Sequence, residues 1–128
     1  MPDPLLQAAL DVRENAFAPY SKFKVGAALE GIDGRIHTGC NVENATYGLT
    51  MCAERVAVFK AVSEGARRFK RVAIAADTDK LTPPCGSCRQ ILWEFCGDVE
   101  IILVNPRGRI EIYRLREIFP KPFDGTFL

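Results

Sequence analysis

The feature that most constrains the fold is a pair of short apolar runs on either side of a helical segment. Residues 72–76 (VAIAA) and 101–104 (IILV) are apolar at successive positions, which is typical of strands covered on both faces. Between them, Cys85 to Cys96 carries apolar side chains at helical spacing and is followed by Gly97. The order strand, helix, strand requires parallel pairing with a right-handed crossover. The pattern therefore predicts an α/β fold with these two strands in the centre of the sheet.

The remaining segments complete a mixed sheet of about five strands in a three-layer α/β/α arrangement. Residues 31–34 form a glycine-rich turn that is typical of an antiparallel hairpin. A second hairpin is expected at residues 105–108, where the sequence NPRG favours a turn. We expect helices over 4–16, 52–64 and 85–96, a short helix near Leu115, and strands over 23–29, 35–39, 72–76, 99–104 and 109–113.

Size and charge limit the class of protein. Domains have roughly 150 residues, so we expect the 128 residues of this chain to form one domain over 1–128. The 17 Lys and Arg residues against 16 Asp and Glu residues provide no basic field for a polyanion, so nucleic acid and anionic membranes are not expected as partners. The N-terminus lacks a basic stretch followed by an apolar one, and no run approaches about 18 apolar residues. We therefore expect a cytoplasmic protein.

The cysteine and histidine content narrows the chemistry. Five cysteines without an export signal argue against a disulfide framework and favour metal binding or catalysis. The chain has one histidine, His37, whereas an H-E-x-x-H zinc site needs two and a Ser/His/Asp triad needs a suitably placed base. The cysteines are thus the first candidates for a functional site.

Two sequence clusters, CAE at 52–54 and PCGSC at 84–88, each lie at the start of a predicted helix. A helix N-terminus presents free N–H groups and a partial positive charge, which favour the thiolate form that binds metal. Cys85 and Cys88 are three positions apart, a spacing that turns both sulfurs toward one ion, and Cys52 can supply a third. Three protein ligands leave the fourth position of zinc open, as in catalytic zinc sites.

Glu54 and Arg55 extend this site. Residues two apart do not face each other along a helix, so Cys52 and Glu54 can converge only on something beyond the helix end, which favours a water molecule on the metal beside the carboxylate. Zinc with three thiolates carries a net negative charge and is a poorer Lewis acid. We therefore expect Arg55 to donate hydrogen bonds to the thiolates; the alternative is an arginine on the helix surface.

Other interpretations of the cysteines remain open. A lone C-x-x-C in a cytosolic protein is also compatible with a thioredoxin-type redox pair, although Cys52, Glu54 and the paired prolines favour metal binding. Cys40 ends a predicted strand and Cys96 occupies an apolar helix position, so both are expected to be small buried side chains rather than ligands.

The two clusters match the pattern of zinc nucleobase deaminases, which is (H or C)-x-E followed by P-C-x-x-C. The chain resembles the small, three-cysteine cytidine deaminases that act on free nucleosides. The resemblance extends through residues 18–26 (APYSKFKVG), 39–45 (GCNVENA) and 119–123 (FPKPF), and so covers nearly the whole chain.

The resemblance implies a role for each matching residue. It implies one Zn²⁺ per chain on Cys52, Cys85 and Cys88, with Glu54 as the catalytic proton shuttle. The side chains of Asn41 and Glu43 would hold the ribose hydroxyls. The substrate-binding residues implied in this way are Phe23, Asn41, Val42, Glu43, Ala53 and Phe123. From the residues alone, Phe23 is equally compatible with strand core and Asn41 with turn chemistry.

The implied function is zinc-dependent hydrolytic deamination of cytidine and deoxycytidine to uridine and deoxyuridine, with release of ammonia, in pyrimidine salvage. The resemblance also implies a homotetramer with active sites at subunit interfaces, where Phe123 reaches a neighbouring pocket; packing of the tail on its own chain is the alternative. Rival functions are a blasticidin-type aminonucleoside deaminase, a polynucleotide-editing deaminase and a non-enzymatic, zinc-stabilised binding module.

Overall fold

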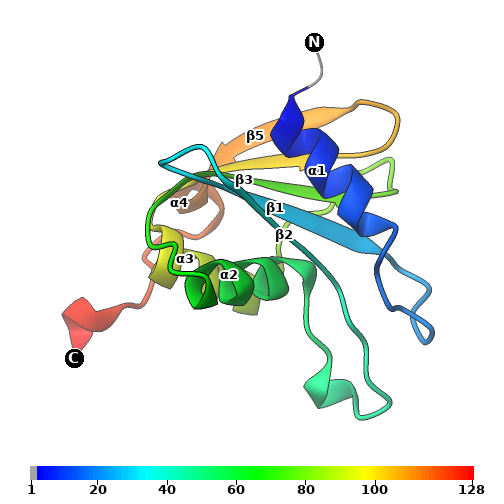
Figure 1. Cartoon of the computed structure of the whole chain (residues 1–128). Helices are drawn as coiled ribbons and strands as arrows, with labels where there is room; N and C mark the ends of the chain where they lie inside the picture. The colour runs from blue at the N-terminus through cyan, green and yellow to red at the C-terminus, as the bar shows by residue number, and fades with distance from the viewer. Residues whose placement is uncertain (1–2) are drawn as a thin grey trace.

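A five-stranded mixed sheet forms the centre of the computed structural model, which describes residues 3–128 (Figure 1). The strand order is β2-β1-β3-β4-β5, with β3 and β4 parallel and the other neighbouring pairs antiparallel. The strands are β1 (Val25–Gly31), β2 (Ile36–Cys40), β3 (Phe69–Ala76), β4 (Glu100–Val104) and β5 (Ile110–Arg114). The helices are α1 (Pro4–Arg13), α2 (Ala53–Ser63), α3 (Gly86–Cys96) and α4 (Leu115–Ile118), with short 3₁₀ turns η1 (Tyr47–Leu49) and η2 (Gly125–Phe127).

The predicted α/β fold is confirmed, with differences at the ends of elements. The first helix ends at Arg13 rather than Ala16, because residues 14–16 form a turn that leads Phe17 into a bridge with Val42. Strand β3 begins at Phe69, three residues earlier than expected, because Lys70 and Arg71 interrupt the apolar pattern that marks its buried part. The two 3₁₀ turns were not predicted.

Helices cover both faces of the sheet, with α1 on one side and α2 and α3 on the other (Figure 1). Alternate residues of the central strands point to opposite faces. Leu29, Ile74 and Ile101 pack toward α2 and α3, whereas Ala28 and Ala73 pack toward α1. The apolar residues at successive positions of β3 and β4 are therefore buried on both faces, as predicted. No helix within residues 3–128 is long and apolar enough to span a membrane.

Two glycines allow the helices to approach the sheet closely. A Cβ atom on Gly26 would lie 2.1 Å from the Ala9 carbonyl oxygen of α1. A Cβ atom on Gly39 would lie 2.4 Å from the Ala57 nitrogen of α2. Neither distance is sterically allowed, so glycine at position 39 determines how closely α2 can lie against β2.

The topology brings the two cysteine clusters together. Strands β2 and β3 are both antiparallel to β1, so they run in the same direction. Their carboxyl ends therefore lie along the same edge of the sheet, the edge formed by the strand ends. Helix α2 begins after the chain leaves β2, and α3 begins after it leaves β3. Both helix N-termini therefore lie at this edge, where α/β sheets commonly bind ligands.

Gly39→Ala should lower the midpoint of thermal unfolding by several degrees, because the added methyl group forces α2 away from β2 at a cost of about 1–3 kcal/mol. Differential scanning fluorimetry measures the change. Gly48 is the matched control, since a Cβ atom there meets nothing within 4 Å. Gly48→Ala should keep the midpoint within about 2 degrees of the parent. Equal midpoints for the two variants would show that α2 does not depend on this close contact.

Candidate functional site

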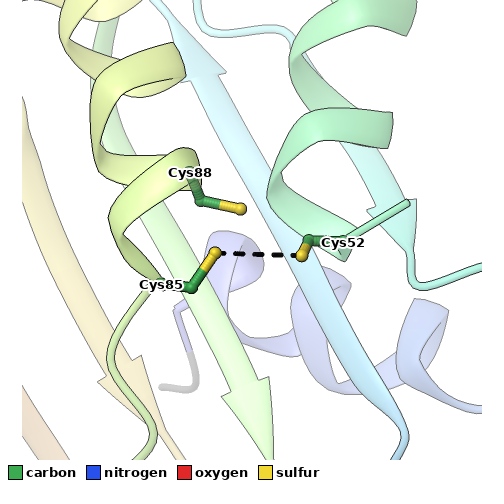
Figure 2. Close-up of side chains that lie close together, drawn as sticks. All are labelled: Cys52, Cys85 and Cys88. Carbon is green, nitrogen blue, oxygen red and sulfur yellow. Dashed lines mark hydrogen bonds between the residues drawn. The ribbon is translucent and has the colours of Figure 1, made fainter. Parts of the chain in front are cut away.

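Three cysteine sulfurs converge at the edge of the sheet where α2 and α3 begin (Figure 2). Cys52 is the N-cap residue of α2, Cys85 is the N-cap residue of α3, and Cys88 lies in the first turn of α3. Their Sγ atoms all lie within 4.8 Å of one another, and the Cys52 and Cys85 sulfurs are 4.0 Å apart. All three are free thiols, and none of them is joined in a disulfide.

The spacing of the sulfurs suits a shared cation. Sulfurs on one tetrahedral zinc ion, with bonds of about 2.3 Å, lie about 3.8 Å apart. A disulfide would instead need about 2.05 Å. The three thiols therefore form a donor set that fits zinc, and Cys52, Cys85 and Cys88 are the residues that would hold it.

The charges within the cluster also favour a cation. Hydrogen bonds from the Cys88 thiol and the Arg55 guanidinium lower the pKa of Cys52 to about 5. The Arg55 Nη2 atom donates to Cys52 Sγ at 3.3 Å. The pKa of Cys88 is raised, because its proton is held by Cys52 and the side chain is fully buried. Without a cation the cluster thus favours one thiolate and keeps Cys88 protonated, whereas a divalent ion stabilises all three thiolates.

Glu54 lies in the first turn of α2, and its side chain is buried, with 6% exposed. Burial raises the pKa of its carboxyl group to about 7, and the negative charge of Cys52 adds to the increase. A carboxyl group that titrates near neutrality can both accept and release a proton during a reaction. Glu54 therefore has the properties of a general acid and base beside the cysteine cluster.

A cavity of about 180 Å³ lies against the cluster. Cys52, Glu54 and Cys85 contribute to its lining. The full lining consists of Phe23, Val25, Asn41, Thr50, Met51, Cys52, Ala53, Glu54, Ile74, Thr82, Pro83 and Cys85. A larger hollow of about 450 Å³ lies beside α1 and is lined by residues of β4 and β5, but it contains none of the candidate site residues.

Asn41 contributes to the cavity wall in an unexpected way. Its side chain is buried, and its Oδ1 atom accepts a hydrogen bond from the Val25 backbone nitrogen at 2.9 Å. Its Nδ2 atom donates to the Phe23 carbonyl oxygen at 2.7 Å. The Asn41 amide thus holds residues 23–25 in place, and this segment carries the Phe23 ring to the cavity.

Val42 and Glu43 lie outside the cavity lining. Val42 is partly exposed, and its backbone pairs with Met51. The Glu43 carboxylate accepts hydrogen bonds from the backbone nitrogens of Tyr20 and Ser21, at 3.0 and 3.1 Å, and from the Ser21 hydroxyl. Glu43 therefore anchors the segment that leads into β1 and faces a separate depression with Tyr20 and Tyr47.

The Phe123 ring is exposed in the C-terminal tail and stacks on Phe127, with ring centroids 5.6 Å apart. The tail backbone is attached to α3 of the same chain. The Gln90 side chain donates to the Phe123 carbonyl oxygen at 2.9 Å, and Trp93 donates to the Asp124 carboxylate at 3.0 Å. The backbone of the tail thus packs on its own chain, while the Phe123 ring is free to contact another molecule.

Sequence reasoning missed several residues of the cavity wall, including Thr50, Met51, Thr82 and Pro83. Met51 directly precedes the first cysteine cluster, and Pro83 directly precedes the second. Proximity to the two clusters was the signal that could have identified them.

Comparison with known proteins agrees with this geometry. A family model described as the cytidine and deoxycytidylate deaminase zinc-binding region matches residues 3–104. The chain belongs to this deaminase family. It is 49% identical over 120 residues to a cytidine deaminase of Sporosarcina psychrophila, covering 93% of this chain and 88% of the relative. A cytidine deaminase of Halalkalibacterium halodurans is 48% identical, covering 93% of this chain and 91% of the relative.

Solved structures of cytidine deaminases have the same fold. The crystal structure of the enzyme from Burkholderia pseudomallei has a TM-score of 0.90 at 44% identity and covers 93% of this chain and 96% of that one. The structure of the Mycobacterium tuberculosis enzyme has a TM-score of 0.81 at 39% identity, with 94% of both chains covered. The predicted deaminase family, α/β fold, enzyme class and zinc cofactor are thereby confirmed.

Replacing Cys52, Cys85 or Cys88 by serine should reduce bound zinc from about one ion per chain to well below half, because two thiolates are an incomplete donor set for zinc. Inductively coupled plasma mass spectrometry of the purified protein measures the metal. Cys40→Ser is the control, since Cys40 lies outside the cluster, and it should retain zinc. Full zinc content in any of the three cluster variants would contradict the assignment of that ligand.

Proposed function

We propose that this protein catalyses the zinc-dependent hydrolytic deamination of cytidine and deoxycytidine to uridine and deoxyuridine, with release of ammonia. The observation that carries the proposal is the buried Glu54 carboxyl next to a three-sulfur cluster at the wall of a small cavity. Relatives named cytidine deaminase at 48% and 49% identity support the choice of substrate. A zinc-stabilised binding module would have no need for a buried acid at this point.

The chain's own residues account for the proton transfers. When bound, zinc supplies a Lewis acid that lowers the pKa of water from about 15.7 toward neutrality. Glu54 accepts a proton from the water that attacks C4 of the pyrimidine and delivers it to N3. It then accepts the proton of the new C4 hydroxyl group and delivers it to the amino group, which leaves as ammonia while the C4 carbonyl forms. Burial raises the pKa of the Glu54 carboxyl group to about 7, so this group can both accept and release protons near neutral pH.

Further residues position the base and adjust the charge of the metal site. Arg55 donates to Cys52 and withdraws negative charge from the thiolate. We infer that the backbone N–H of Ala53 and the carbonyl group of Cys85 orient the pyrimidine, and that the Phe23 ring packs beside it. The Asn41 and Glu43 side chains support the ribose end of the site, directly or through the segments that they hold.

The working enzyme is proposed to be a homotetramer with active sites at subunit interfaces. On the outer side of α2 and α3, Phe59 and Phe95 form an edge-to-face pair with centroids 6.4 Å apart, and both remain more than a third exposed. The exposed rings of Tyr47, Phe123 and Phe127 add further apolar surface. Exposed apolar patches of this kind are typical of protein interfaces.

We further propose that residues 1–128 form one domain and that the enzyme acts in cytoplasmic pyrimidine salvage.

Glu54→Gln should retain zinc but lower kcat for cytidine by about 10² to 10⁴, because the amide can neither accept nor deliver the protons. The decrease in ultraviolet absorbance and the release of ammonia measure turnover. Glu94→Gln is the control, since Glu94 is exposed on α3, and it should keep wild-type activity. Substantial turnover by the Glu54 variant would remove Glu54 from this role.

The same assay compares the rival functions. Preference for blasticidin over cytidine would favour an aminonucleoside deaminase, and salt-sensitive activity restricted to single-stranded polynucleotide would favour an editing enzyme. Absence of turnover on all three substrates by the zinc-loaded protein would favour a binding module.

In the proposed tetramer, the Phe123 ring, which is exposed on its own chain, is buried against the neighbouring subunit. Phe123→Ala should therefore raise KM for cytidine roughly tenfold, because loss of a buried aromatic anchor commonly costs about 1 kcal/mol or more. Native mass spectrometry should find the parent protein as a tetramer. Phe127→Ala, which removes the ring that stacks on Phe123, separates loss of stacking from loss of the Phe123 contact. A monomeric parent with full activity would contradict shared active sites.

A further inference from the structure

The loop at residues 77–84 joins β3 to Cys85 and has no regular secondary structure. Thr82 and Pro83 in this loop line the cavity, and Pro84 directly precedes the ligand residue Cys85. A segment without a helix or a strand ladder needs other partners for its backbone groups. The position of this wall of the cavity therefore depends on what holds the loop.

The turn between β4 and β5 provides that support, mainly through hydrogen bonds of the Asn105 side chain. The Asn105 side chain is almost fully buried, with 2% exposed. Its Nδ2 atom donates to the Thr78 carbonyl oxygen at 3.0 Å. Its Oδ1 atom accepts from the backbone nitrogens of Arg107 and Arg109, both at 3.0 Å. One side chain thus closes its own turn with its oxygen and holds the neighbouring loop with its nitrogen.

The connection continues from Thr78 to the cavity. The Thr78 and Thr82 hydroxyls lie 3.0 Å apart and form a hydrogen bond across the loop. Between them, Leu81 is buried in the core that faces α2 and α3. Asn105 is therefore linked through Thr78 to Thr82, a residue of the cavity wall.

Ion pairs on the surface support the loop less strongly. Arg107 contacts the carboxylates of Asp77 and Asp79, at 2.6 and 3.1 Å. These side chains are about half exposed or more, and exposed ion pairs contribute little to stability because water screens them. A buried donor facing a carbonyl group is costly to lose, because the carbonyl is left without a partner.

We propose that Asn105 is a positioning residue for the nucleoside cavity, acting from the β4–β5 turn through Thr78 on the wall formed by Thr82 and Pro83. This inference rests on the proposed function for its effect on substrate binding. Asn105 acts on substrate binding more than on proton transfer, because Glu54 lies in α2, which is not part of this connection.

Asn105→Asp is the most selective test. The aspartate keeps an oxygen for the Arg107 and Arg109 nitrogens but replaces the donor to Thr78 with a carboxylate oxygen that repels the carbonyl group. KM for cytidine should rise roughly fivefold or more, with kcat within about twofold and zinc unchanged. A purely structural role would instead lower the active fraction, and so kcat, without changing KM. Unchanged KM would overturn the proposal.

Two further variants complete the experiment. Thr78→Val removes the hydroxyl bond to Thr82 while keeping the backbone, so it should also raise KM, and its effect should be less than additive with that of Asn105→Asp. It decides the question if the Asn105 variant does not fold. Arg107→Gln is the control, because it removes only the exposed ion pairs, and it should leave KM unchanged.

Hydrogen exchange provides a readout that does not depend on activity. In Asn105→Asp, the amides of residues 77–82 should exchange faster than in the parent, while those of α2 should not change. If the parent protein does not deaminate cytidine, the proposed function fails, and faster exchange would still support the link between turn and loop. Equal exchange of the loop in both proteins would overturn that link.

Discussion

Three thiols held within 4.8 Å of one another impose the main physical constraint on this molecule. Thiolates at this distance repel, so they cannot all ionise unless a cation lies between them. Hydrogen bonds from the Cys88 thiol and the Arg55 guanidinium provide part of the compensation: they lower the pKa of Cys52, while the pKa of Cys88 is raised. A bound zinc ion would compensate the remaining negative charge of the thiolates. Metal binding is therefore coupled to the ordering of the segments that carry the three cysteines. Burial, together with the negative charge of Cys52, raises the pKa of Glu54 to about 7, so the metal ligands and the proposed proton-transfer group depend on one local environment.

The packing of the helices on the sheet brings the cysteine clusters together. Small side chains face α1, including Ala28 and Ala73, while larger ones such as Leu29 and Ile74 fill the space below α2 and α3. Gly39 brings the backbone of β2 against α2, where no side chain would fit. The parallel direction of β2 and β3 then places the starts of α2 and α3 side by side. Packing on the sheet thus determines whether two cysteine clusters 33 positions apart in sequence meet at one point.

The walls of the cavity come from irregular segments, and polar side chains hold each of them by its backbone. Asn41 holds residues 23–25, Glu43 holds Tyr20 and Ser21, and Asn105 holds the loop that carries Thr82. Irregular backbone needs such partners because its N–H and C=O groups are not satisfied by a helix or a strand ladder. Asn41 and Glu43, which sequence similarity assigns to substrate binding, thus also hold the backbone segments that border the cavity.

Local sequence patterns were sufficient to predict most helices and strands and the donor set of the metal site. Apolar runs predicted β3 and β4, and the spacing of Cys85 and Cys88 with the upstream Cys52 and Glu54 predicted the donors and the acid, because these signals depend on residues close together in the chain. Contacts seen only in the folded chain show that Glu43 is not among the residues lining the cavity, that the Asn41 amide bonds to the backbone of residues 23–25, and that Asn105 bonds to the loop that carries Thr82. These contacts join segments that are far apart in the chain. They follow from strand register and from the packing of helices on the sheet, and not from any local sequence pattern.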